Sequence, residues 1–229
     1  MLILSLNIKQ GGGSRLDKII SYIKKINPDI CILCEYRQNK NTLYLHDELD
    51  HLGLVYKSSE SVGENINQVF IASKVEFETE DIKGLDEAYK KNILIAHFPK
   101  FLIYALYFPQ KNQKKNLYRY LINKKTNNIP HLMMGDFNTG MHYIDEEQAT
   151  FYCEDLFRNL LDGWTDLWRS RNKIKEEYSW YSNQKRGFRI DHALGNEILN
   201  GLVSDIYYDH STRNTISDHS ALIVKLKKI

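Results

Sequence analysis

The sequence has only four prolines and three cysteines among its 229 residues, and it has no apolar run of membrane-spanning length. No linker rich in proline or glycine, internal repeat or low-complexity tract divides the chain, so we expect one domain over residues 1–229. The first six residues lack the basic region and cleavage site of a signal peptide and are typical of a strand. The odd number of cysteines favours a reducing cytoplasmic location, and the lack of a long apolar run favours no association with membrane.

A marked excess of charge of one sign is also absent, because 31 basic residues accompany 29 acidic ones and the net charge is +2. This balance excludes a polycationic coat for nucleic acid, and any anionic ligand must be attracted by a local patch. The 42% hydrophobic and 26% charged content is typical of a globular protein with a sizeable core. No feature indicates an obligatory protein partner, and we expect a monomer.

Two of the cysteines form a C-x-x-C pattern, Cys31 and Cys34, inside the apolar run 30–34. The pattern has a zinc or redox interpretation. On a strand, however, residues three apart face opposite sides of the sheet, which is poor geometry for chelation, and no second C-x-x-C exists. We therefore expect both cysteines to be buried small hydrophobic residues.

Short apolar runs predict the strands of a layered α/β or α+β domain. Apolar residues recur at helical spacing over 16–26, with Ser14 as the expected N-cap and Asn27 at the end. The predicted strands cover 2–6, 30–34, 69–73, 93–98, 102–106, 132–134, 188–194, 203–208 and 221–226, and further helices are predicted near 42–52, 114–122 and 154–161.

The segment Gly135-Asp136-Phe137-Asn138 directly follows one of these buried strands. Gly135 lets the chain turn, and residues i and i+2 of an extended segment point the same way, so Asp136 and Asn138 can converge on one ligand. A carboxylate that accepts a proton beside an amide that holds an oxygen is typical of a hydrolase. Asp and Asn are also common in turns, so the segment alone leaves a simple turn open.

Asp136 is one of several polar residues that lie where predicted strands begin or end. Because sheets gather strand ends along one edge, where ligand sites form, we expect these side chains to lie near one another. They are Asn7, Glu35, Tyr107, Asp136, Asp191, Asp218 and His219.

In order along the chain, these segments resemble those of the endonuclease/exonuclease/phosphatase superfamily, which includes exonuclease III, abasic-site endonucleases and deoxyribonuclease I. The resemblance extends from Asn7 to His219. It implies a four-layer α/β/β/α sandwich of two packed mixed β-sheets, with a divalent-metal phosphodiesterase site at one end. The segments are Leu6-Asn7-Ile8, Cys34-Glu35-Tyr36-Arg37, Tyr107-Phe108-Pro109-Gln110, Gly135-Asp136-Phe137-Asn138, Arg189-Ile190-Asp191-His192 and Ser217-Asp218-His219-Ser220.

The resemblance implies that Glu35 is the principal Mg²⁺ ligand, with Asn7 beside it and Asp218 near the metal, directly or through water. Such oxygen ligands suit Mg²⁺, with Mn²⁺ as a substitute. Lys9 departs from the family, in which many abasic endonucleases have an acidic or amide residue. A lysine cannot ligate Mg²⁺ and would repel a second cation, so a two-metal site is not expected; it could contact a phosphate or lie solvated in the loop.

The resemblance also implies the catalytic groups. Asp136 would orient or deprotonate the attacking water, with Asn138 positioning it. His219 would contact the phosphate, hydrogen-bonded to Asp191, which fixes its tautomer and favours its protonated form. Tyr107 would donate a hydrogen bond to a non-bridging phosphate oxygen.

Candidate substrate contacts lie in clusters of basic residues at 111–115, 124–125, 169–173 and 185–189, the last two interleaved with aromatic residues such as Trp180. For any single cluster, a solvated helix face with core aromatics is the favoured interpretation. Arg189 lies two residues before Asp191 on the predicted strand and is the best single candidate, because it would share the face of Asp191.

Two further groups of residues have structural interpretations. The acidic run 145–147 could form a second metal site, but a solvated loop or helix start is favoured. His192 should point away from Asp191, and the remaining histidines have no partners at zinc-ligand spacing.

The sequence thus favours a Mg²⁺-dependent phosphodiester hydrolase, a DNA nuclease of exonuclease III type, with DNA as its partner. The alternatives are a hydrolase of a small or lipid-linked phosphate such as an inositol phosphate, and an inactive binding module. The short segment between 181 and 191 leaves little room for a DNA-intercalating loop, so specificity for abasic sites does not follow.

Overall fold

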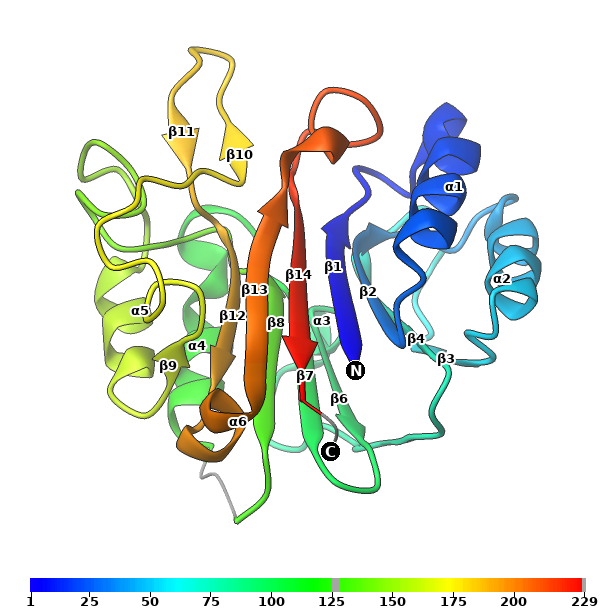
Figure 1. The fold of residues 1–229 in the computed structure, drawn as a ribbon, viewed down its shortest axis with the longest axis horizontal. Coiled ribbons are helices and arrows are strands. Elements are labelled where there is room, and N and C mark those ends of the chain that lie inside the picture. Colours follow the sequence, from blue (N-terminus) through cyan, green and yellow to red (C-terminus); the bar gives the residue numbers. More distant parts are fainter. Residues whose placement is uncertain (125–127, 228–229) are drawn as a thin grey trace.

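The computed structural model describes residues 1–124 and 128–227. Within these ranges the strands form two six-stranded sheets and one two-stranded hairpin (Figure 1). The first sheet, in the order β13-β14-β1-β2-β4-β3, contains β1 (Leu2–Asn7), β2 (Ile30–Tyr36), β3 (Tyr56–Ser59), β4 (Gln68–Ser73), β13 (Val203–Asp209) and β14 (Ala221–Leu226). The second, in the order β5-β6-β7-β8-β12-β9, contains β5 (Glu78–Thr79), β6 (Ile93–His97), β7 (Leu102–Tyr107), β8 (His131–Asp136), β9 (Thr165–Asp166) and β12 (Asp191–Gly195). The hairpin consists of β10 (Trp180–Tyr181) and β11 (Gly187–Phe188).

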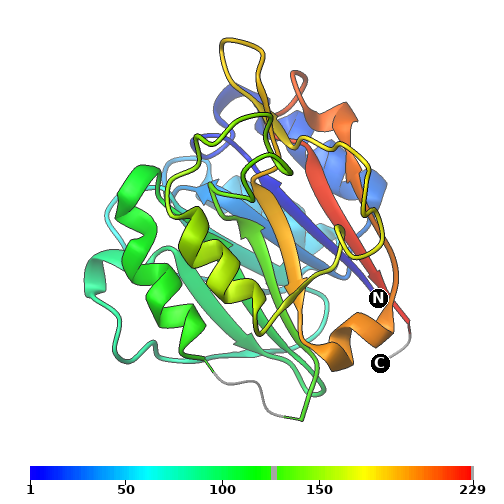
Figure 2. The same cartoon turned by 90° about the vertical axis from the view of Figure 1, so that its left-hand side faces the viewer.

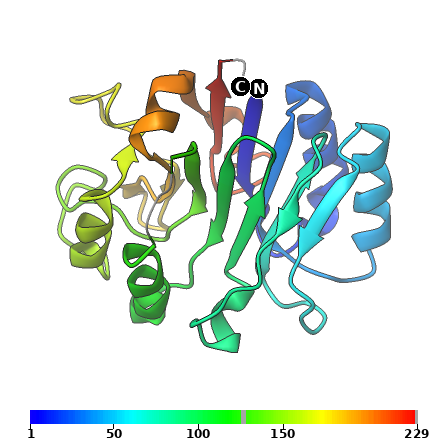
Figure 3. The same cartoon turned by 90° about the horizontal axis from the view of Figure 1, so that it is seen from below.

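Helices cover the outer face of each sheet. Helices α1 (Leu16–Ile26) and α2 (Thr42–His51) lie on the first sheet, and α4 (Lys115–Ile122) and α5 (Glu154–Leu161) lie on the second (Figures 2 and 3). This arrangement confirms the predicted α/β/β/α sandwich. The short helices are α3 (Glu87–Lys90), α6 (Glu197–Leu202) and the 3₁₀ turns η1 (Gly13–Arg15), η2 (Lys111–Lys114) and η3 (His210–Thr212). Among the described residues, no helix combines the length and hydropathy that a membrane crossing requires.

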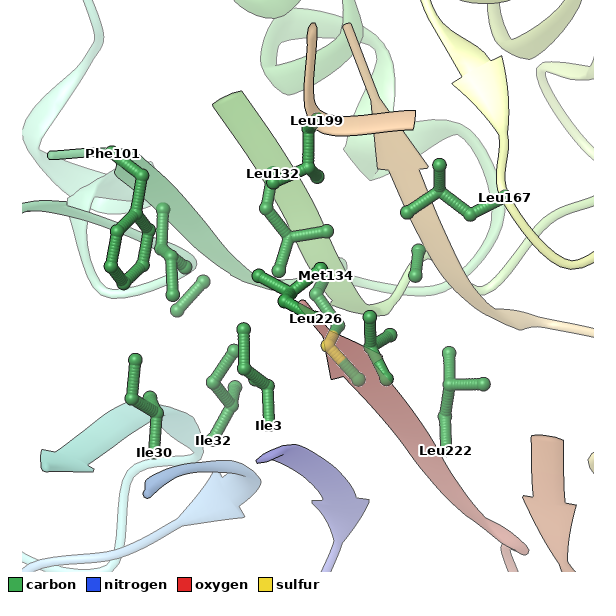
Figure 4. Packing of buried hydrophobic residues seen from close by; sticks show 14 of the residues in the cluster. Ile3, Ile30, Ile32, Phe101, Leu132, Met134, Leu167, Leu199, Leu222 and Leu226 are labelled. Atoms are coloured by element: carbon green, nitrogen blue, oxygen red, sulfur yellow. The ribbon is translucent and has the colours of Figure 1, made fainter. Parts of the chain in front are cut away.

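The main hydrophobic core lies between the two sheets (Figure 4). Ile3, Ile32 and Leu222 of the first sheet pack in the same cluster as Leu132 and Met134 of the second, and all five side chains are fully buried. Strands covered on both faces need no polar alternation, which explains why their sequences read as continuous apolar runs.

The two cysteines of the C-x-x-C pattern are both buried and unpaired. Cys31 packs in the cluster under the helices of the first sheet, whereas the Sγ of Cys34 donates to the carbonyl of Leu106 in the second sheet at 3.2 Å. The two thiols therefore face opposite sides of β2, as predicted. Burial raises the pKa of both.

The register of the sheets brings the polar strand ends to one end of the sandwich. β1 pairs parallel with β2, and β7 pairs parallel with β8, so that Tyr107 lies opposite Asp136. β12 runs antiparallel to β8 and begins at Asp191, also opposite Asp136. β14 runs antiparallel to β1 and is preceded by 217–220 at that same end, which is at the top of Figure 1.

Two local predictions were wrong. The strand expected over 188–194 is interrupted, because β11 ends at Phe188 and β12 begins at Asp191. Ser14 is not an N-cap: it lies inside η1, and Arg15 precedes α1 without a side-chain cap. The helix does end at Asn27, which adopts a left-handed conformation with φ 51°.

Candidate active site

The strand ends surround a pocket of about 290 Å³. Most of the side chains predicted to act together line it, and apolar rings form part of its wall. Its lining includes Glu35, Asp136, Asn138, Asp218 and His219 with Lys111, Lys114, Phe151, Trp180 and Phe188.

The turn after β8 is fixed by its backbone. Gly135 has φ 148°, and a Cβ there would lie 1.8 Å from the carbonyl oxygen of Leu106, so only glycine fits. Asn138 has φ 49°, and its backbone N–H donates to Asp136 Oδ1 at 2.9 Å. Its side-chain nitrogen donates to Asp136 Oδ2 at 3.3 Å and to the carbonyl of Phe108 at 2.6 Å. Asn138 therefore holds the Asp136 carboxylate at the pocket.

The side chain of Asn7, at the end of β1, connects two carboxylates. Its amide nitrogen donates to Asp136 Oδ2 at 3.0 Å and to Glu35 Oε1 at 3.2 Å. Its oxygen accepts the backbone N–H of Lys9 at 2.9 Å. In this orientation Asn7 presents hydrogen-bond donors to the carboxylates, and its oxygen is directed to the loop.

Glu35 lies within β2 at a bulge, where the pairing register with β4 shifts between Leu33 and Tyr36. Its φ of 56° is in the left-handed region, which turns its side chain out of the strand's alternation. Glu35 Oε2 accepts the backbone N–H of Gln10 at 2.8 Å. The bulge therefore directs a carboxylate to the pocket from a strand that is otherwise apolar.

The residues Asp191 and His219 form a buried pair, with Nδ1 of the ring 2.8 Å from Asp191 Oδ2. Burial by itself would lower the pKa of His219, but the Asp191 carboxylate outweighs it and raises that pKa to about 10. The ring is therefore an imidazolium at neutral pH. The Tyr208 hydroxyl donates to the backbone carbonyl of Asp191 at 2.5 Å and so helps to fix the position of Asp191.

Asp136 is fully enclosed between these groups. Burial, and then the charge of Asp191, raise its pKa, whereas His219 and the hydrogen bonds from Asn138 and Asn7 lower it. The net direction is upward, so Asp136 accepts a proton more readily than an ordinary carboxylate.

Three side chains, Asp136, Asp191 and His219, bring potential metal-ligating atoms within 4.8 Å of one another. An imidazolium has no lone pair for a metal, however, and Asp191 is already engaged by it. The carboxylate oxygens of Glu35 and Asp218, with Asp136 beside them, are the better donors. Such hard oxygens suit Mg²⁺ or Mn²⁺.

Tyr107 ends β7 next to this group. Its hydroxyl oxygen accepts a hydrogen bond from Asn67 at 3.3 Å, so its own O–H can donate elsewhere. Burial, followed by the charges of Glu35 and Asp136, raises the pKa of Tyr107, and it stays a neutral phenol.

Comparison with known sequences decides the family. The sequence model of the Endonuclease/Exonuclease/phosphatase family matches residues 4–219. The chain belongs to this family. As a family member it is a hydrolase of phosphate esters, which confirms the prediction of an enzyme. A search of curated proteins finds no match.

Solved structures agree with the fold of this family member. An AP endonuclease from Archaeoglobus fulgidus is 22% identical, with a TM-score of 0.82 and 100% of both chains covered. The 3′ phosphatase NExo from Neisseria, bound to a product DNA hairpin, and the 3′-5′ exonuclease NExo from Neisseria meningitidis are each 20% identical, with TM-scores of 0.84 and 100% of both chains covered. At these identities the likeness establishes the shared fold.

One predicted substrate contact of the hydrolase was wrong. Arg189 is fully buried, and its guanidinium donates to Asp145 Oδ1 at 2.7 Å and to Asp166 Oδ2 at 2.6 Å. The break in the strand before Asp191 removes the alternation on which the prediction rested. Arg189 is thus a structural residue.

The acidic run 145–147 was also misjudged as solvated. Asp145 and Glu146 are both buried. Arg169 joins Arg189 on Asp145, at 2.9 Å, while Glu146 accepts the backbone N–H groups of Thr150 and Phe151 at 2.7 and 2.9 Å. These bonds secure the loop that carries one wall of the pocket.

The other two predicted substrate residues lie at the site. Trp180 is half-buried in the pocket wall, with its ring centroid 6.4 Å from that of His219. Lys9 lies beside the pocket, with Nζ 3.2 Å from Asp218 Oδ2. His192 is buried on the opposite face of β12, as predicted, with Nε2 2.7 Å from the carbonyl of Thr139.

Sequence reasoning missed Lys114, which it left in an ordinary basic cluster. Only 1% of this side chain is exposed, and Nζ donates to the Asn138 carbonyl and to Thr139 Oγ1. Burial lowers its pKa to about 8, against the opposing effect of Asp136. A signal was present, because position 114 falls on the same helical face as the buried Leu117, Tyr118 and Leu121. Of the cluster 124–125, residue 125 lies outside the described residues.

Proposed function

We propose that this family member is a Mg²⁺-dependent phosphodiesterase, specifically a DNA nuclease of exonuclease III type. The single observation that carries the proposal is the pocket that joins the Asp191–His219 pair to the Asp136 carboxylate. It combines a fixed imidazolium with a carboxylate suited to accept a proton, and phosphate hydrolysis requires both.

The cation would be held by Glu35 and Asp218, with Asn7 as a positioning residue that holds Glu35 and Asp136 together. The oxygen donor set fits Mg²⁺, or Mn²⁺ in its place. When bound, the ion would offset negative charge that develops on the phosphate during reaction.

Asp136 would orient the attacking water and accept its proton. Its raised pKa suits it to this role near neutral pH. Asn138 acts on the water through Asp136, since both its backbone and side-chain nitrogens donate to that carboxylate. The attack forms the new bond from water oxygen to phosphorus as the bond to the leaving oxygen breaks.

His219 and Tyr107 would bind the phosphate. The imidazolium is held through Nδ1 by Asp191, which leaves the Nε2–H as a charged donor at the pocket. The Tyr107 hydroxyl supplies a neutral donor from the neighbouring strand. Lys9, whose side chain is half-exposed, would add a third contact to a phosphate oxygen.

The pocket wall favours a nucleic acid over a small phosphate ester. Trp180, Phe188 and Phe151 present apolar ring surface beside the charged groups, which suits a sugar or base next to the scissile phosphate. The structural neighbours named as an AP endonuclease and as a phosphatase bound to a DNA hairpin support DNA as the polymer.

A second candidate is a phosphatase that removes a terminal phosphate. Lys111 lines the same pocket and would offset the second charge of a phosphate monoester. This candidate needs no contact with a polymer.

A substrate panel with Mg²⁺ and with EDTA separates these activities. It comprises supercoiled plasmid, linear duplex, abasic oligonucleotide, a 3′-phosphorylated oligonucleotide, RNA and an inositol phosphate. We expect Mg²⁺-dependent cleavage of DNA that is abolished in His219→Ala, with Lys18→Gln on the exposed face of α1 as a control. Turnover of the small ester alone would refute the nuclease assignment.

A further inference from the structure

The hydroxyl of Tyr107 lies at the end of a short chain of hydrogen bonds. Arg37 Nε donates to Asn67 Oδ1 at 2.5 Å, and Asn67 Nδ2 donates to the Tyr107 hydroxyl oxygen at 3.3 Å. Arg37 directly follows β2, Asn67 directly precedes β4, and Tyr107 ends β7. The chain therefore connects two loops of the first sheet to a phosphate contact that is expected on the second.

The direction of both hydrogen bonds is fixed by Arg37. A guanidinium has N–H donors but no acceptor, so the amide oxygen of Asn67 has to face Arg37. The amide nitrogen then faces Tyr107, and because an NH₂ group can only donate, the Tyr107 oxygen has to accept. The hydroxyl proton of Tyr107 is consequently directed away from Asn67 and can be donated to a phosphate oxygen.

Both ends of the chain are held by their surroundings. The backbone N–H of Tyr107 donates to the Asn92 carbonyl at 2.9 Å, and the Tyr107 carbonyl accepts Asn92 Nδ2 at 2.6 Å. At the other end, the stem of Arg37 packs against Gly11, where an added Cβ would lie 3.2 Å from Arg37 Cβ. Asn92 thus fixes the strand end that carries the ring, whereas Asn67 acts on the hydroxyl itself.

We propose that Arg37 and Asn67 are positioning residues, which act through Tyr107 by making its hydroxyl an obligatory hydrogen-bond donor to the phosphate. The inference rests on the proposed phosphodiesterase function and adds two residues to it. A donor that is already oriented needs no rearrangement when negative charge grows on the phosphate oxygens, and such donors favour the transition state over the bound substrate.

Asn67→Asp tests the direction of the chain, because it keeps the shape of the side chain but replaces the donor with an acceptor. The new carboxylate keeps the bond to Arg37 as an ion pair, so the melting temperature should stay unchanged or rise. The Tyr107 hydroxyl should then donate to residue 67 instead of to the phosphate. With Mg²⁺ and the DNA substrate that the panel identifies, we expect kcat to fall about 10²-fold.

Two further variants of this loop separate direction from structure. Asn67→Leu changes the shape and loses both hydrogen bonds but leaves the Tyr107 proton free, so it should lower kcat less than Asn67→Asp does. A merely structural role predicts the reverse order, and that order would overturn the proposal. Asn65→Asp, the same change on an exposed side chain two positions earlier, is the matched control and should leave kcat unchanged.

A double-mutant cycle with Tyr107→Phe excludes simple repulsion of the substrate by the added carboxylate. In the Tyr107→Phe background the hydroxyl proton is already missing, so Asn67→Asp should cause little further loss of kcat. Repulsion would persist in that background. Losses that multiply would therefore contradict a role through Tyr107.

Arg37 is tested by rescue. Arg37→Met frees the Asn67 amide to turn its oxygen toward Tyr107 and should lower kcat, whereas Arg37→Lys keeps a group without an acceptor and should restore most of the activity. A raised KM with unchanged kcat in both variants would make Arg37 a direct substrate contact and overturn its positioning role.

The fate of the inference and that of the proposed function can be told apart. Near-normal kcat in Asn67→Asp would overturn the inference and leave the function standing. Absence of DNA cleavage by the unmodified protein would instead refute the proposed function, and this inference with it.

Discussion

Two networks of charge lie on either side of the start of β12, and they differ in the balance between cations and carboxylates. In the inner network, Arg189 and Arg169 face Asp145 and Asp166, so two cations match two carboxylates. The pKa of Asp145 is lowered, because the guanidinium of Arg189 outweighs the effect of burial; the pKa of Asp166 is lowered for the same reason.

In the outer network, carboxylates exceed fixed cations. Glu35, Asp136, Asp191 and Asp218 are accompanied there by His219 and Lys9, and the pKa of Asp136 is raised by burial and by the neighbouring Asp191. A matched network stabilises the fold, whereas an unmatched one retains affinity for a cation, a proton or both. This difference distinguishes Arg189, which stabilises the fold, from Asp191, which belongs to the candidate site, although the two are only two positions apart in the sequence.

The largest expected effect comes from neutralising the outer network. Asp136→Asn keeps the shape of the side chain but removes the proton acceptor, so kcat should fall by about 10²- to 10⁴-fold. The free energy of unfolding should stay unchanged or rise, since a buried charge with a raised pKa is removed. Steady-state kinetics and thermal melts measure the two quantities. Near-normal turnover would show that Asp136 does not handle the proton.

A substitution in the inner network is expected to lower stability first, in contrast to one in the outer network. Arg189→Met leaves Asp145 and Asp166 buried without their main cation and should lower the free energy of unfolding by about 3–5 kcal/mol. Chemical denaturation measures this, and Arg186→Met on the exposed hairpin is the control. A stable Arg189→Met variant that had lost only activity would return Arg189 to the substrate contacts.

A smaller effect on the free energy of unfolding should appear as the pH is raised. The folded-state pKa of His219 is about 10, above its ordinary value of 6.5. Its contribution to stability is therefore complete below pH 6.5 and is lost as the pH rises to 10. Denaturation of the metal-free protein at pH 6, 8 and 10 should show this decline, and His219→Gln should flatten it. An equal slope in the variant would contradict the imidazolium.

The smallest effects on kcat and on stability are expected for Lys114, whose surroundings combine features of both networks. Lys114 is buried like the inner arginines but bonds only neutral oxygens near Asp136. Lys114→Met should lower kcat about tenfold by loosening the 136–138 turn, while stability changes by about 1 kcal/mol or less, because relief of a buried charge offsets the lost hydrogen bonds. Lys115→Met, on the exposed face of α4, is the control for both measurements. A drop in stability of several kcal/mol would make Lys114 a structural residue.

The local pattern of apolar residues in the sequence predicted most of the strands and helices. Apart from β12, apolar runs located the long strands within one or two residues, and helical spacing located α1, α4 and α5, because burial on a regular element imposes a period. Among the missed elements, β5 and β9 contain only two residues, too few to show a period. The four-residue β3 and the six-residue α6 were missed as well. Glu35 was placed after its strand, whereas a bulge sets it inside β2.

What the sequence determined by itself is the set of polar groups at the strand ends, because each follows an apolar run that has to be buried. Only the tertiary structure decided which charges are matched. Arg189 meets Asp145 across 44 positions of sequence, and Asn7 meets Asp136 across 129. Alternation along a strand holds only while the strand is regular, and the break before Asp191 turned one charge inward and left the other at the pocket.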